Sequence, residues 1–276
     1  HYNGVDTERA AKTLDAILGN IDIKGGTCPG VGAKWKYPKV KNMPKAKKLK
    51  IIDGLKGDAV FPTHHVSHRV FDNIKEGSQG RPDVYMTYCY SPVYANGACQ
   101  AHIDVLKDEK LIPYHVSVNP FYDEGSALAD LILPDSTYLE RLSWDDMVCY
   151  EQMPVFYIRQ PLIKPLGESR QFQDVCIDMA ERLGLDLGFK STEDFVRKSC
   201  KASQVDYEKI MKTGLWIPPG SKPLFQQYSQ EIPAEKLAKK ELLFDTETGV
   251  YWNWKKSKAK SKDEAEKNGY TKTKNA

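Results

Sequence analysis

Two β-rich runs with a helical segment between them constrain the fold of this chain most strongly. Asp83–Tyr90 ends in Ser91-Pro92, and Leu111–Val118 ends in Asn119-Pro120. Apolar periodicity predicts helices at His102–Lys110 and Glu124–Leu131. Because strands that alternate with helices are typical of a parallel sheet, the expected fold class is α/β, with a mostly parallel sheet flanked by helices.

Polar residues follow each of the two predicted strands. In parallel α/β sheets, ligands bind at the carboxyl ends of the strands. Ser91, Asn119 and their neighbours are therefore candidates to bind a nucleotide-like ligand. Asn119-Pro120 can also form nothing more than a tight turn. The sequence leaves these two interpretations open.

The start of the chain combines a helix with a glycine-rich loop. Val5–Leu18 is predicted to be a helix that Asp6 caps and that ends at Gly19-Asn20. The spacing in Gly25–Gly32 matches neither a dinucleotide fingerprint nor a P-loop, so a plain exit loop is the simpler interpretation. Further on, the pattern predicts an extended segment at Leu162–Gly167, helices at Gln173–Leu183, Thr192–Lys198 and Tyr207–Lys212, and a loop at Leu215–Pro223.

Charge and hydropathy exclude several classes of protein. The formal net charge is +3, yet Lys34–Lys50 holds eight lysines without an acid, and residues 255–276 hold eight lysines. We interpret both stretches as solvated, the second as a partly disordered C-terminal tail, and expect no nucleic-acid partner. No window approaches the roughly 18–20 apolar residues of a membrane span, so we expect a soluble chain without membrane insertion.

Cysteine and histidine spacing gives no metal site. The six cysteines contain no C-x-x-C pair, and His64-His65-x-x-His68 lacks the glutamate of a zinc-protease motif. We therefore assign no metal ligand within this chain. The absence of any catalytic residue follows only from the resemblance described next.

Five stretches in a fixed order resemble the large catalytic subunits of the molybdopterin oxidoreductases, the dimethyl-sulfoxide-reductase family. They are His1–Ala10, Leu18–Gly26, Ser91–Gly97, Asn119–Arg141 and Lys164–Ser169. The resemblance covers about residues 1–185, and the block from Ala129 to Arg141 is its most specific part. It implies the third domain of such a protein, not a whole enzyme.

The resemblance also implies a domain division, a cofactor and partners. Residues 1–190 are expected to be part of an α/β domain that binds molybdopterin guanine dinucleotide, 191–254 a helical or irregular extension, and 255–276 a Lys-rich tail or linker. The implied cofactor is molybdenum-bis(molybdopterin guanine dinucleotide), and a 4Fe-4S cluster is expected in the parent subunit but is not encoded in this chain. The implied partners are an oxyanion substrate, the remaining domains of the same polypeptide and an iron–sulfur electron-transfer subunit. The parent enzyme is expected to be periplasmic or extracytoplasmic.

Carried over residue by residue, the cofactor-binding positions of the family fall on Ser91, Pro92, Val118, Asn119 and Arg141. The family more often has Asn at the first position and Asp at the fourth. We expect these residues at one edge of a parallel sheet, with the Gly25–Gly32 loop close by. Arg141 can pair with a phosphate, or it can form a surface ion pair with Glu140 or Asp145.

The family resemblance implies two-electron oxo transfer by the parent enzyme. Tyr138–Met147 and Phe156–Pro161 look most like the branch that reduces arsenate, tetrathionate, thiosulfate or polysulfide, and arsenate or tetrathionate is the favoured acceptor. The chain alone is expected to be inactive. The alternative is a stand-alone nucleotide- or nucleic-acid-binding α/β module.

Overall fold

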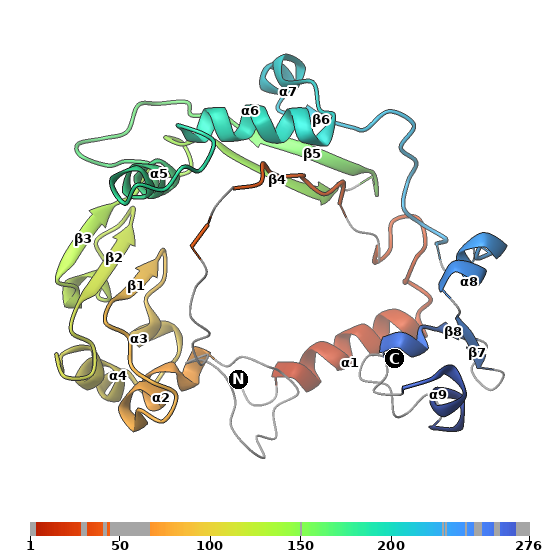
Figure 1. Cartoon of the computed structure of the whole chain (residues 1–276), viewed down its shortest axis with the longest axis horizontal. Helices are drawn as coiled ribbons and strands as arrows, with labels where there is room; N and C mark the ends of the chain where they lie inside the picture. The colour runs from red at the N-terminus through yellow and green to blue at the C-terminus, as the bar shows by residue number, and fades with distance from the viewer. Residues whose placement is uncertain are drawn as a thin grey trace. The chain divides into compact units, whose positions relative to one another are not determined.

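The computed structural model describes residues 4–28, 32–40, 43–44, 67–149, 151–227, 229, 231–240, 242–245, 250–256 and 260–268. The chain divides into two compact units, His1–Phe225 and Gln226–Ala276 (Figure 1). The domain boundaries expected from the sequence stay predictions.

A three-stranded parallel sheet forms the part of the first unit that the sequence predicted most directly. Its strands are β1 (Tyr85–Tyr88), β2 (His115–Asn119) and β3 (Leu131–Pro134), in the order β1-β2-β3. Both neighbouring pairs run parallel. The central strand β2 is buried along its whole length, as a strand covered on both faces must be. The expected α/β class with a parallel sheet flanked by helices is confirmed.

Helices cover the face of this sheet on which Tyr85 lies. α3 (Pro92–Ala95) and α4 (Cys99–Leu106) connect β1 to β2, and α2 (Val70–Glu76) follows the short 3-10 helix η1 (Ser67–Arg69) (Figure 1). Their apolar side chains form one core with Tyr85 packed against it. The buried members are Phe71, Ile74, Val93, Val105, Leu106 and Ile112.

The prediction of a helix at Glu124–Leu131 is wrong. Only Ser126–Leu128 forms a 3-10 turn, η2, and the backbone is already extended at Ala129. The carboxylate of Asp123 accepts a hydrogen bond from Ser126 N at 2.7 Å and so closes a short turn in place of a helix. The apolar run that follows then pairs with Val116–Asn119 as β3.

An antiparallel sheet, which the sequence did not predict, forms the other part of the first unit. Its order is β4 (Ser143–Val148), β5 (Pro154–Arg159) and β6 (Leu215–Trp216), so the expected loop at Leu215–Pro223 begins with a short strand. α6 (Thr192–Ser203) and α7 (Tyr207–Thr213) contribute to its core, and residues outside these elements, such as Trp35 and Leu142, complete it. The buried members of this core are Trp35, Leu142, Phe156, Ile158, Val196, Cys200, Val205 and Ile210.

Two further helices match the sequence prediction, α1 (Gly4–Ile17) and α5 (Phe172–Arg182). The expected capping role of Asp6 is wrong, because this residue lies inside the first turn and pairs with Arg9. Gly19 follows the end of α1 and has a φ of 68°, the left-handed conformation expected of a glycine that terminates a helix. The apolar stripe of α1 is exposed, and Ile17 keeps 76% of its accessible area.

The second unit contains α8 (Ala234–Lys240), β7 (Leu243–Asp245), β8 (Val250–Trp252), the 3-10 helix η3 (Trp254–Lys256) and α9 (Lys262–Asn268). The two strands are antiparallel. Leu243 and Ala265 are buried with Trp254 packed against them. The Lys-rich stretch 255–276 therefore includes a helix in its described part.

Candidate functional site

The strands of the parallel sheet end together at what we call the carboxyl edge, formed by residues 88–91, 119 and 135–136. Cys89 N donates to Val118 O at 2.9 Å, and Asp135 N donates to Asn119 O at 3.2 Å. These bonds continue the ladder beyond β1 and β3. The edge is thus contiguous across all three strands.

Arg141 lies at the carboxyl edge and pairs with a buried carboxylate. Its Nη1 donates to Asp135 Oδ2 at 2.6 Å and to Tyr88 Oη at 2.7 Å. The side chain of Asp135 has no exposed area, and its Oδ1 accepts a hydrogen bond from Phe172 N at 2.9 Å. Arg141 is therefore held from two sides while 20% of its side chain stays exposed.

The sequence suggested two other partners for Arg141, and both are wrong. The Glu140 carboxylate accepts hydrogen bonds from Thr137 N at 2.7 Å and Leu166 N at 2.9 Å. The bond from Thr137 is the main reason why the pKa of Glu140 is lowered. Asp145 Oδ1 accepts from Asp146 N. Both carboxylates thus accept hydrogen bonds from backbone N–H groups, and neither pairs with Arg141.

Two serine hydroxyls at the carboxyl edge are buried without a hydrogen-bond partner among the described residues. One is Ser91 Oγ, after β1, and the other is Ser136 Oγ, after β3. A Cβ added to Gly125 would come within 2.9 Å of Ser91 Oγ and 3.3 Å of Ser91 Cα, so Gly125 packs closely on Ser91 and a larger residue would displace that hydroxyl. Buried hydroxyls are normally paired, so these two are exceptions within the described part of the chain.

The other predicted contacts are less accessible. Asn119 uses both ends of its amide within its own loop: Nδ2 donates to Asp123 Oδ2 at 2.9 Å, and Oδ1 accepts from Phe121 N at 3.1 Å. This geometry favours the turn interpretation of Asn119-Pro120. Val118 and Pro92 are buried, and Val118 O already accepts from Cys89 N. Contact of these three residues with a ligand stays a prediction.

The glycine-rich loop is braced by the hairpin that joins β4 to β5. Gly25 N donates to Gln152 Oε1 at 3.2 Å, and Gln152 Nε2 donates to Ile23 O at 3.0 Å. Gln152 is 5% exposed and has a φ of 59°, a conformation that few side chains adopt. The described part of the loop contacts this hairpin, and its proximity to the carboxyl edge stays a prediction.

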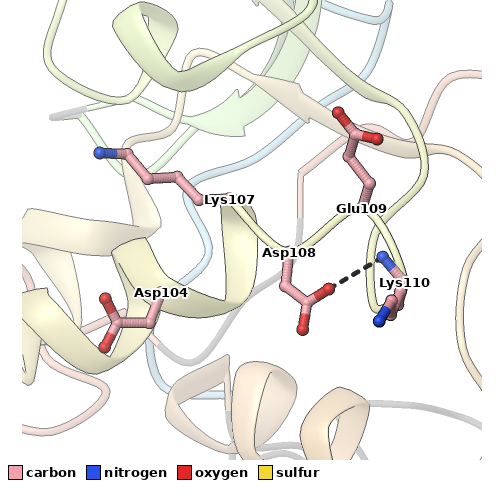
Figure 2. A pocket seen from close by; sticks show the side chains of 5 residues that line it. All are labelled: Asp104, Lys107, Asp108, Glu109 and Lys110. Atoms are coloured by element: carbon pink, nitrogen blue, oxygen red, sulfur yellow. Dashed lines mark hydrogen bonds between the residues drawn. The ribbon is translucent and has the colours of Figure 1, made fainter.

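A surface hollow lies where α4 leads into β2 (Figure 2). It mixes both signs of charge, and Asp108 Oδ1 accepts a hydrogen bond from Lys110 N at 2.9 Å. The hollow precedes His115, at the amino end of β2, so it lies at the opposite edge of the sheet from Ser91 and Arg141. Its lining residues are Asp104, Lys107, Asp108, Glu109 and Lys110.

Metal-binding clusters and membrane-spanning helices are both absent from the described part of the chain. Within those ranges no group of three or more His, Cys, Asp or Glu side chains is arranged to hold a metal ion. His64 and His65 lie outside the described residues. None of the described helices is both long and apolar enough to cross a bilayer.

No family model matches the chain. Comparison with individual proteins does find relatives. The menaquinone reductase molybdopterin-binding-like subunit of Nitratidesulfovibrio vulgaris is 34% identical over 140 residues, which is 50% of this chain and 19% of the relative. A sulfite dehydrogenase subunit from Allochromatium vinosum is 29% identical, with 67% of this chain and 23% of the relative covered. The thiosulfate reductase molybdopterin-containing subunit of Salmonella typhimurium is 26% identical, with 66% and 25% covered.

The chain is related to the molybdopterin oxidoreductases. It spans about a fifth to a quarter of the length of these three relatives. Among solved structures, this chain is similar to acetylene hydratase from Pelobacter acetylenicus, with a TM-score of 0.46 and 17% identity. The similarity covers 55% of this chain and 20% of the hydratase chain.

The tyrosine, the aspartate and the second serine of the carboxyl edge were not predicted from the sequence. They are Tyr88, Asp135 and Ser136. The last two follow β3 directly, so identifying Leu131–Pro134 as a short apolar strand stopped by proline would have found them.

Proposed function

We propose that the carboxyl edge of β1–β3 binds the guanosine diphosphate end of a molybdopterin guanine dinucleotide. The observation that supports this most is the buried Ser91 Oγ, which has no partner among the described residues and lies beside Gly125, on the same edge as Arg141. Short polar side chains at strand ends are suited to the base and ribose of a nucleotide, and a guanidinium is suited to its phosphates.

Each residue has a distinct part in this proposal. Ser91, which is partly exposed, offers a hydroxyl that can donate or accept a hydrogen bond, whereas Ser136 is fully buried and supports the edge from behind. Arg141 keeps donors on Nε and Nη2, because its bonds to described residues use Nη1 alone. Asp135 fixes the guanidinium and is itself fully enclosed, so it orients Arg141 without touching the ligand. The cofactor supplies, when bound, the metal at which oxygen transfer takes place.

For the whole protein we propose a catalytic subunit that reduces or oxidises an oxyanion by two-electron oxo transfer. Relatives named for sulfite, thiosulfate and selenate favour a sulfur or selenium oxyanion. Arsenate and tetrathionate, which the sequence favoured, remain alternatives. The other domains of the same polypeptide, an iron–sulfur electron-transfer subunit, a bis(guanine dinucleotide) cofactor and an extracytoplasmic location belong to the same proposal.

A footprint on Cys89 tests the nucleotide site. Cys89 is exposed and lies on the carboxyl edge, whereas Cys176 is exposed on α5 and serves as an internal control. We expect millimolar GDP to slow alkylation of Cys89, and not of Cys176, when the modified peptides are quantified by mass spectrometry. Equal alkylation rates of Cys89 with and without GDP would count against the site, and protection by a DNA or RNA oligonucleotide in place of GDP would favour the alternative module.

A further inference from the structure

We propose that Tyr88 is a phosphate-binding residue of the carboxyl edge and acts together with Arg141. The inference rests on the proposed nucleotide site and adds a contact that the sequence did not predict. Tyr88 is the last residue of β1 and lies opposite Val118 in the sheet register. The residue is 40% exposed, so its side chain reaches the surface at this edge.

The hydrogen bond between Tyr88 and Arg141 does not use the hydroxyl proton of Tyr88. Arg141 Nη1 donates to Tyr88 Oη, so the tyrosine oxygen is the acceptor at 2.7 Å. A tyrosine hydroxyl that accepts one bond can still donate its own proton. The neighbouring Cys89 side chain also hydrogen-bonds Tyr88, but thiol sulfur is a weak acceptor compared with a phosphate oxygen.

The same arrangement holds the guanidinium in a fixed direction. Nη1 is engaged by Asp135 and Tyr88, and none of the described residues accepts a bond from Nε or Nη2. Those two nitrogens therefore remain for an anion, next to the hydroxyl of Tyr88. Because the buried Asp135 balances the charge of Arg141, the site attracts phosphate through directed hydrogen bonds more than through net charge.

Two further facts support a donor role for this hydroxyl. Burial, with Asp135 adding to it, raises the pKa of Tyr88, so the proton is retained at neutral pH. The ring stacks on Phe172 with centroids 5.1 Å apart, so rotation of the hydroxyl away from the edge is restricted. A phenylalanine at position 88 would keep the stacking and lose only the hydroxyl.

Calorimetry tests this inference by comparing the wild-type chain with the Tyr88→Phe variant. Three probes are titrated into each protein. GDP contains both phosphate and base, guanosine lacks the phosphates, and pyrophosphate lacks the nucleoside. We expect Tyr88→Phe to weaken GDP and pyrophosphate about tenfold, the size of one hydrogen bond to a charged group, and guanosine less than about twofold. Tyr114→Phe is the matched control, because Tyr114 is 41% exposed at the amino edge of the same sheet.

The outcomes separate this inference from the proposed function. Unchanged GDP binding by Tyr88→Phe, or an equal loss for guanosine, would overturn the role of Tyr88 and leave the nucleotide site intact. If the wild-type chain binds pyrophosphate but no guanosine, the phosphate contact stands and the guanosine site fails. If the wild-type chain binds none of the three probes, both proposals fail.

Discussion

Arg141 donates a 2.6 Å hydrogen bond to Asp135, whose side chain is completely enclosed. Arg141→Gln would leave that buried carboxylate with the backbone N–H of Phe172 as its donor. We expect the free energy of unfolding to fall by about 2–3 kcal/mol, as for a charge-assisted bond broken on one side. Denaturant titration checks this. Arg170→Gln is the control, since Arg170 and Asp178 are both about half exposed and their pair should contribute less than about 1 kcal/mol.

Tyr85 makes stability sensitive to alkaline pH. Burial raises the pKa of Tyr85 to about 12, from an ordinary value of 10.0. The unfolded chain therefore releases this proton first, and stability is lost as pH rises from 10 towards 12. At pH 11 the loss from Tyr85 is about 1.4 kcal/mol. Urea unfolding at pH 8 and 11 should show a smaller decrease for Tyr85→Phe, and an identical decrease would contradict the assignment.

His115 should have the opposite effect, at acidic pH. It is 2% exposed, and burial lowers its pKa below the ordinary 6.5. The unfolded chain takes up the proton first as pH falls. The contribution of His115 to the free energy of unfolding is therefore fully present above pH 6.5 and is lost as pH drops below it. We expect the loss between pH 7.5 and 5 to be smaller in His115→Phe than in wild type. An equal loss in the two proteins would contradict this assignment.

Gln152 should determine how firmly the glycine-rich loop is held. Gln152→Ala removes the acceptor of Gly25 N and the donor to Ile23 O. We expect a loss of about 1–3 kcal/mol and faster hydrogen exchange at the amide of Gly25. Gln100→Ala is the control, because the Gln100 side chain is exposed and bonds within α4, to Asp104. Unchanged exchange at Gly25 would show that the brace is not needed.

Ser136 should affect the stability of the carboxyl edge and not its binding of a ligand. Its Oγ is buried without a partner among the described residues, so Ser136→Ala should raise the free energy of unfolding by up to about 1 kcal/mol. The same change should leave GDP binding unchanged, because Ser136 is 0% exposed and does not reach a ligand, and weaker binding would contradict this placement. Ser117→Ala is the counterpart, because Ser117 Oγ is 2.9 Å from Ser126 Oγ, and its loss should destabilise the chain.

The sequence was informative where the period of apolar residues is clear. β1, β2 and the helix between them could be predicted because β-rich runs and polar turns alternate there. β3 was missed because Leu131–Pro134 is short and its apolar run is equally typical of the end of a helix. The partner of Arg141 was missed for the same reason, since Asp135 comes next in the chain.

Long-range contacts account for what the sequence could not reveal elsewhere. The antiparallel sheet joins β5 to β6 across a long stretch of chain, and Trp35 packs on Phe156 from another part of the sequence. The brace of Gln152 on Gly25 spans 127 positions. No local pattern encodes such pairs, because each partner alone looks like an ordinary polar or aromatic residue.

The outer strand β3 has one further consequence. It pairs with β2 alone within the described sheet, and Leu131 and Ile132 are 39% and 36% exposed. Its carboxyl end is already occupied, because Pro134 O accepts a hydrogen bond from Arg170 N at 3.0 Å and Asp135 forms an isolated bridge with Arg170. Proline at the end of the strand also discourages strand addition. A further strand, from the same polypeptide or from another copy, can therefore extend this sheet only along the part of β3 that precedes Pro134, so Arg170 limits how far the sheet can grow in this direction.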